Sequence, residues 1–182
     1  MATYITSDLH LQHIGALKWR TENVDVRSAD ADIVDRINSV CGKSDSLVMI
    51  GDITGPRVND KAAYAKALND IVCDKIYIIP GNHDYRTLDL TMSILGRRAK
   101  ILPPIYERRG MLHPIFIMSH YPLESWNGQG YGVKHYHGHS HGHARQVKNR
   151  FDVSIIESVP TPISLELSYE DYVAYSVGYE ED

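Results

Sequence analysis

Strand-like segments alternate with amphipathic ones through the first half of the chain, and this alternation limits the possible folds more than any other feature. The strand-like runs are residues 4–7, 47–50 and 76–79. The segments with apolar residues at helical spacing are residues 28–41 and 60–72. Ser28 is the expected N-cap of the first helix, and Gly42 is its expected stop. A strand–helix–strand–helix–strand order predicts parallel strands joined by right-handed crossovers, and therefore an α/β protein.

The second half of the chain has a different pattern. Its strand-like segments are residues 101–106, 111–118, 133–137 and 151–156. They are joined mostly without helices, so we expect a second, more antiparallel layer. Ser168 and Asp171 have the spacing of a capping box, which predicts a short helix near the C-terminus. The 182 residues contain no internal repeat or linker, so we expect one domain over residues 1–182.

Composition excludes several classes of protein. No apolar run approaches the roughly 20 residues that cross a bilayer, and no signal-like leader follows Met1. A net charge of -4 gives no general positive field to hold nucleic acid. Cys41 and Cys73 are too few for a disulfide framework and are expected to be buried thiols. These observations favour a cytoplasmic protein that does not associate with membranes.

Polar clusters directly follow five of the predicted strands. They are Asp8 with His10, Gly51-Asp52, Gly81-Asn82-His83-Asp84, His120, and His139 with His141. In open α/β sheets, ligands bind beyond the carboxyl ends of the strands, so we expect these clusters to converge on one crevice. Each cluster alone is compatible with an ordinary turn, and the histidine-rich segment alone with a solvated histidine tract.

Together the clusters offer carboxylate, imidazole and amide donors but no thiolate. The candidate ligands are Asp8, His10, Asp52, Asn82, His120, His139 and His141. Seven ligands are too many for one tetrahedral ion, whereas two ions that share a bridging carboxylate fit the number. This donor chemistry suits manganese, iron, zinc, cobalt or nickel. A pair of such ions is a standard device for phosphoryl transfer.

With these motifs in view, the chain resembles the calcineurin-like metallophosphoesterases, in particular the small single-domain members found in prokaryotes and phages. The resemblance covers most of the chain and rests on D-x-H, G-D, G-N-H-D, H and G-H-x-H in this order. It implies a four-layer sandwich of two mixed β-sheets flanked by helices. It also implies that Asp8, His10 and His141 hold a first metal, that Asn82, His120 and His139 hold a second, and that Asp52 bridges them.

The resemblance leaves His83 outside the metal ligands. We expect two divalent ions, with manganese first among the alternatives, and hydrolysis of phosphodiesters, with phosphomonoesters also possible. In this hypothesis a metal-bridging hydroxide attacks phosphorus, His83 assists the leaving group, and Asp84 orients and polarises His83.

Other residues suggest where a substrate binds. Trp126, with Tyr121 and Tyr131, could form an aromatic wall, although packing onto the body is an equal alternative. Arg145 follows the last metal motif and could hold an anion. The expected partner is a phosphate-ester small molecule, a nucleotide or a nucleic acid, and no protein partner is predicted. The alternatives are a non-catalytic metal-binding scaffold of the same fold and a metal store.

Overall fold

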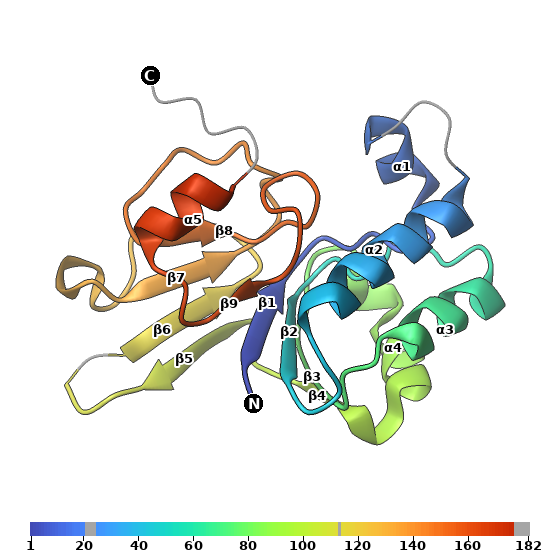
Figure 1. Ribbon diagram of the computed structural model, residues 1–182, viewed down its shortest axis with the longest axis horizontal. Coiled ribbons are helices and arrows are strands. Elements are labelled where there is room, and N and C mark those ends of the chain that lie inside the picture. Colours follow the sequence, from blue (N-terminus) through green and yellow to red (C-terminus); the bar gives the residue numbers. More distant parts are fainter. Residues whose placement is uncertain (21–24, 113, 177–182) are drawn as a thin grey trace.

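The computed structural model describes residues 1–20, 25–112 and 114–176 and contains two β-sheets packed face to face (Figure 1). The first sheet has the order β4-β3-β2-β1-β9, and the second has the order β5-β6-β7-β8. The strands are β1 Thr3–Thr6, β2 Ser46–Ile50, β3 Lys75–Ile79, β4 Ala99–Ile101, β5 Ile105–Arg109, β6 Pro114–Ser119, β7 Lys134–His137, β8 Arg150–Asp152 and β9 Ile163–Ser164. The α-helices are α1 Ile14–Arg20, α2 Val26–Val40, α3 Lys61–Asp70, α4 Leu88–Leu95 and α5 Tyr169–Tyr175.

The first sheet confirms the parallel arrangement predicted from the alternating segments. β1, β2, β3 and β4 are parallel neighbours, and β9 pairs antiparallel with β1. Helices α2, α3 and α4 cover the face of this sheet that points away from the second sheet (Figure 1). Both sheets contain parallel and antiparallel pairs, and helices lie outside them, so the predicted α/β architecture of two mixed sheets flanked by helices is confirmed.

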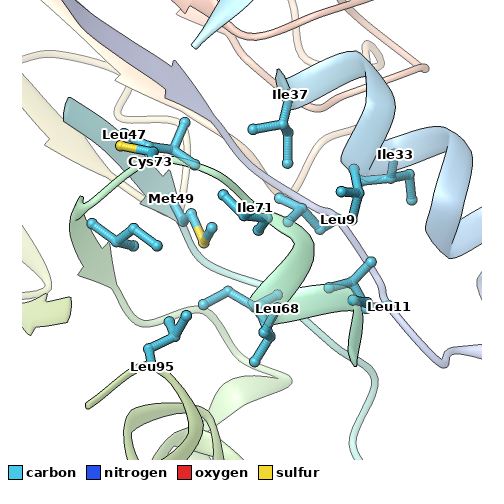
Figure 2. Close-up of a cluster of buried hydrophobic side chains, with 14 of the residues drawn as sticks. Leu9, Leu11, Ile33, Ile37, Leu47, Met49, Leu68, Ile71, Cys73 and Leu95 are labelled. Atoms are coloured by element: carbon cyan, nitrogen blue, oxygen red, sulfur yellow. The ribbon is translucent and has the colours of Figure 1, made fainter. Parts of the chain in front are cut away.

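Buried strand β2 shows how the two hydrophobic cores are divided. Because side chains alternate along a strand, Leu47 and Met49 point toward the helices, and Val48 and Ile50 point toward the second sheet. Figure 2 shows the helix-side cluster, in which Leu47 and Met49 meet apolar side chains of α2 and α3. Cys73 belongs to the same cluster, and both cysteines are fully buried thiols, as predicted.

Helix α2 begins two residues before the predicted N-cap. The cap is Asp25, whose carboxylate accepts hydrogen bonds from the backbone N–H groups of Arg27 and Ser28. The Ser28 hydroxyl donates to the same carboxylate at 2.7 Å instead of capping the helix itself. A carboxylate at this position satisfies two backbone donors and interacts favourably with the helix dipole. The end is close to the prediction, with Cys41 as the C-cap before Gly42.

The predicted strand over residues 101–106 is two strands in two different sheets. β4 ends at Ile101 and β5 begins at Ile105, with Pro103 and Pro104 between them. Proline has no backbone N–H to give to a sheet, so two successive prolines end one ladder and let the chain pass to the other.

The second sheet is less antiparallel than predicted. Only β5 and β6 pair antiparallel, whereas β6, β7 and β8 are parallel neighbours. The loops over residues 120–133 and 138–149 therefore return the chain to the same end of the sheet without an α-helix. As a result, the polar segments that follow β6 and β7 emerge at one edge, which antiparallel pairing would have prevented.

The outer face of the second sheet is covered by the 120–133 loop. Trp126 and Val133 pack on Ile117 there, and the Trp126 indole N–H donates to the Val133 carbonyl at 2.7 Å. Helix α5, capped by Ser168 as predicted, packs against β8 and contributes Tyr172 to the core between the sheets. Among the described residues, no helix combines the length and the apolar character needed to cross a bilayer.

Buried His135 on β7 gives a testable dependence of stability on pH. Its Nε2 accepts the backbone N–H of Leu123 at 3.0 Å, which requires that this nitrogen carries no proton. Burial, together with neighbouring His137, lowers the pKa of His135 from 6.5 to about 3. Below pH 6.5, His135 becomes protonated in the unfolded chain but stays neutral in the folded protein. The contribution of His135 is therefore complete above pH 6.5 and is lost as the pH falls toward 3.

We expect the free energy of unfolding to fall by about 2 kcal/mol more in the wild type than in His135→Gln between pH 6.5 and pH 4.5. Glutamine retains a hydrogen-bond acceptor but does not titrate. Urea denaturation of the metal-free proteins at the two pH values measures this difference, and equal losses in both proteins would contradict the prediction.

Candidate metal centre

All seven predicted ligands lie in loops at the carboxyl ends of strands. Asp8 and His10 follow β1, Asp52 follows β2, Asn82 follows β3, His120 follows β6, and His139 and His141 follow β7. Six of them form two groups whose donor atoms lie within 4.8 Å of one another. The structure thus brings together residues that are more than 130 positions apart in the sequence.

The first group consists of Asp8, His10 and His141. The Nε2 atoms of His10 and His141 are 3.3 Å apart. Asp8 Oδ1 lies 3.8 Å from His10 Nε2 and 3.4 Å from His141 Nε2. Three donors at these separations surround a common point, which is the arrangement that a shared cation requires.

The second group consists of Asp52, His120 and His139. His120 Nε2 lies 3.5 Å from Asp52 Oδ1 and 3.0 Å from the amide oxygen of Asn82. The imidazole of His139 stands edge-on to that of His120, with ring centroids 5.2 Å apart. Asn82 therefore lies beside this group, whereas its role as a ligand and a bridging role for Asp52 stay predictions.

The backbone at these loops is held in an uncommon conformation. The φ angles are positive at Asp8, His10, Asp52, His139 and His141, with values of 55°, 51°, 52°, 66° and 47°. Left-handed backbone is disfavoured for residues with a Cβ atom and persists where the surrounding structure enforces it. Five candidate ligands in this conformation indicate that the loops are shaped to aim these side chains.

Two glycines of the sequence motifs allow the loops to pack this closely. A Cβ atom on Gly81 would lie 2.3 Å from the Asp52 carboxylate. A Cβ atom on Gly138 would lie 2.2 Å from the Asp8 carboxylate. Both glycines are therefore needed because carboxylates approach the backbone, which explains their place beside the ligands in G-N-H-D and G-H-x-H.

The charges of the centre are strongly coupled. Burial raises the pKa of Asp8 to about 6. Burial opposes protonation of His120, but the Asp52 and Asp8 carboxylates outweigh it and raise the pKa of its imidazole to about 9. Burial also opposes ionisation of Asp52, but His120 and the His83 backbone N–H overcome it and lower the Asp52 pKa. A cation that binds here would displace the proton that the two carboxylates favour on His120.

His83 lies beside this centre with its side chain 30% exposed. Its backbone N–H donates to Asp52 Oδ1 at 2.9 Å, and its Nε2 lies 3.8 Å from Asp52 Oδ2. Its ring is 5.5 Å from that of His10, measured between centroids. An imidazole placed here can reach a molecule bound over the carboxylates.

The hydrogen bonds of the Asp84 carboxylate run to the backbone of two loops. The Asp84 carboxylate accepts the backbone N–H groups of Gly81 and Asp52 at 2.8 Å each, and that of Ile53 at 3.0 Å. Buried Asp84 therefore fastens the G-D loop to the G-N-H-D loop. Asp84 thereby fixes the position of Asp52 and of the G-N-H-D loop, and its expected role in orienting and polarising the His83 imidazole stays a prediction.

A network that the sequence analysis missed holds the last motif. Buried Asp152 accepts hydrogen bonds from Ser140 Oγ at 2.7 Å, from the Gly142 N–H at 2.9 Å and from Ser154 Oγ at 2.6 Å. Ser154 Oγ also lies 3.0 Å from Asp8 Oδ2. One carboxylate thus connects the loop of His139 and His141 to Asp8. The available signal was a charged residue within the apolar segment over residues 151–156.

The residues expected to contact a substrate lie in different settings. Trp126 is only 8% exposed and packs in the core of the second sheet, so it has no face for stacking and the expectation of an aromatic wall at Trp126 is wrong. Tyr121 is 51% exposed and its ring lies 4.6 Å from that of His139. Arg145 is exposed and forms an ion pair with Glu124.

The geometry agrees with a comparison to known families. The sequence model of the calcineurin-like phosphoesterases matches residues 1–162. The chain belongs to the calcineurin-like phosphoesterase family. The resemblance drawn from the motifs is therefore confirmed, and with it a hydrolytic phosphoesterase family that binds two divalent metals.

Relatives of this chain include the gene 66 protein of Mycobacterium phage L5, which is 27% identical over 132 residues. That match covers 66% of the chain and 63% of the phage protein, so the chain spans less than two thirds of this relative. The structure is similar to that of a protein of unknown function from Aquifex aeolicus, with a TM-score of 0.60 and 17% identity. The similarity covers 90% of this chain and 95% of the Aquifex chain, and it shows a shared fold.

The residues present fit the two metals that the family binds. Each group offers a buried carboxylate and two imidazoles, and the second adds the amide oxygen of Asn82. Nitrogen and oxygen donors without thiolate suit manganese, iron, zinc, cobalt or nickel. The donor set does not choose among these metals.

Proposed function

We propose that this phosphoesterase hydrolyses phosphodiesters, and phosphomonoesters more slowly, at a centre of two divalent ions, with manganese the first to test. The observation that carries the proposal is the pair of ligand groups with His83 beside them. Asp8, His10 and His141 would hold one ion, and Asn82, His120 and His139 the other, with Asp52 shared between them. When bound, the ions supply Lewis-acid charge for the phosphoryl oxygens and an activated water.

The chain's own residues supply orientation and proton transfer. Asp52 accepts the His83 backbone N–H and so fixes where the imidazole stands. From there His83 donates a proton to the oxygen that leaves phosphorus, work worth about 10² to 10⁴ in rate. Asp84 keeps the two loops in register through three backbone hydrogen bonds. A scaffold that only binds metal would have no use for a partly exposed imidazole that is not a ligand.

Of the aromatic residues expected to form a substrate wall, Tyr121 keeps this role, because Trp126 is buried. Its exposed ring lies against His139 and His120, so a planar leaving group can pack on it next to the second ligand group. A nucleotide or an aromatic ester fits this surface.

Arg145 stays a predicted anion contact. Replacing Arg145 with alanine should raise KM for a nucleotide diester more than for a small ester.

Hydrolysis of two chromogenic esters tests the proposal. The metal-stripped protein is supplied with Mn²⁺ and assayed with bis-p-nitrophenyl phosphate and with p-nitrophenyl phosphate. We expect faster turnover of the diester, abolished by chelation. His83→Ala should lose this turnover. The matched control is His143→Ala, which removes an exposed histidine from the histidine-rich segment and should turn over the diester at the wild-type rate.

Turnover of the monoester alone would make the protein a phosphatase and overturn the preference for diesters. If neither ester is cleaved with manganese, nickel, cobalt, zinc or iron while two metals bind per chain, the enzyme proposal fails. A non-catalytic scaffold of the same fold would then be the better description.

A further inference from the structure

The two ring nitrogens of His10 face different partners. Nε2 points to the first ligand group, 3.3 Å from His141 Nε2 and 3.8 Å from Asp8 Oδ1. Nδ1 lies 3.0 Å from Nδ1 of His13, a histidine outside the ligand pattern. An imidazole that binds a metal through Nε2 keeps its proton on Nδ1, so His10 has one N–H to donate, and His13 is placed to accept it.

At two other predicted ligand histidines, an oxygen atom lies beside Nδ1. His120 Nδ1 lies 2.9 Å from the backbone carbonyl of Ile50. His141 Nδ1 lies 3.4 Å from the carboxylate of Glu157. A carbonyl or a carboxylate is the usual acceptor behind a metal-binding imidazole. Behind His10 the same position is filled by the imidazole of His13.

His13 is held in place by the loops around it. A Cβ atom on Gly55 would lie 2.6 Å from His13 Cγ, so the backbone of Gly55 packs directly on the ring. The His13 ring also contacts those of His10 and His83, with centroids 5.0 Å and 5.3 Å away. The His13 backbone N–H donates to the His10 carbonyl at 3.1 Å. These contacts hold the ring beside His10, and the 3.0 Å distance between the two Nδ1 atoms gives its direction.

We propose that His13 is a positioning residue for the first metal, which accepts the Nδ1–H of His10 and so fixes the tautomer and the aim of that ligand. The inference rests on the proposed metal centre. It gives His13 a proton on Nε2 and none on Nδ1. Loss of such an outer partner typically weakens metal binding by about 10-fold to 100-fold. The effect belongs to the first ion, because His10 is not part of the second group.

Two variants separate the hydrogen bond from packing. His13→Phe keeps a planar ring against Gly55 but removes the acceptor. His13→Asn places an amide oxygen at the same distance along the side chain as Nδ1, so it restores an acceptor and loses the ring. Mn²⁺ is titrated into each metal-free protein, and free Mn²⁺ is followed by electron paramagnetic resonance, which gives two dissociation constants without any assay of hydrolysis.

We expect one dissociation constant to rise 10-fold to 100-fold in His13→Phe while the other stays within threefold of the wild type. In His13→Asn both constants should return to within threefold of the wild type. The inference is overturned if both constants are unchanged in His13→Phe, if both rise together, if His13→Asn binds as weakly as His13→Phe, or if the wild type does not bind two Mn²⁺. Thermal melts of the metal-free variants confirm that each is folded.

The two proposals fail in different ways. A wild type that binds two Mn²⁺ but cleaves no ester, with binding that still depends on His13, would remove the proposed function and leave this inference intact. If the wild type cleaves diesters and both Mn²⁺ dissociation constants are unchanged in His13→Phe, the proposed function stands and the inference about His13 fails.

Discussion

Replacing His83 with alanine should lower kcat for phosphodiester hydrolysis by about 10² to 10⁴ and leave both metals bound. The backbone N–H of His83 donates to the Asp52 carboxylate at 2.9 Å, whereas the imidazole Nε2 is 3.8 Å away, and alanine keeps the backbone donor. The loss should also depend on the leaving group. A proton donor matters most when the departing oxygen is strongly basic, so the variant should lose more with a nucleoside or alkyl ester than with p-nitrophenyl esters.

Steady-state kinetics on both kinds of ester, with metal content measured by atomic absorption, check this result. His143→Ala is the matched control, because it removes an exposed histidine from the same protein without touching either ligand group. A His83→Ala enzyme that loses a metal, or that loses equal activity on every leaving group, would show that His83 does not act as the proton donor.

Replacing Asp52 with asparagine should abolish measurable turnover and leave at most one metal bound per chain. Asp52 is 2% exposed, lies 3.5 Å from His120 Nε2 and accepts the His83 N–H. The substitution keeps the shape but removes a buried negative charge from a site that two cations would share. Removing one member of a buried charge pair typically costs about 3 to 5 kcal/mol, so metal affinity should fall at least a hundredfold.

Asp70→Asn is the control for Asp52→Asn, since Asp70 is an exposed partner of Lys66 at the end of α3. Isothermal titration of both variants with Mn²⁺, followed by diester assays at saturating metal, separates loss of binding from loss of chemistry. Full activity of Asp52→Asn at high Mn²⁺ would exclude a charge-bearing role for Asp52.

The fold could be predicted from the sequence where the spacing of apolar residues within one segment is enough to specify a helix or a strand. Leu47 to Ile50 is apolar on both faces and became a buried parallel strand. The direction of the strands in the second sheet could not be predicted, because the loops between them contain no α-helix to mark a crossover. Helix α4 was missed, and strand β9 is only two residues long and depends on its pairing with β1.

The grouping of the candidate ligands could be predicted from the sequence, because donor atoms are recognised by type and their order by motif. The contacts of Asp84 and Trp126 could not. Each depends on which atoms lie nearby: three backbone N–H groups around Asp84, and the Val133 carbonyl beside the Trp126 indole. His13 has the same limitation. It becomes informative only when its nitrogen is found 3.0 Å from that of His10.

The hydrogen bonds of Asp8 bear on the order in which the molecule assembles. Asp8 Oδ2 accepts the backbone N–H of His139, 131 residues later in the chain, and lies beside Ser154, 146 residues later. Contacts of such sequence separation form late in folding, because the intervening chain must first be ordered. A metal ion held by Asp8, His10 and His141 would therefore be expected to bind only after both sheets have docked, which would make its capture a reporter of complete folding.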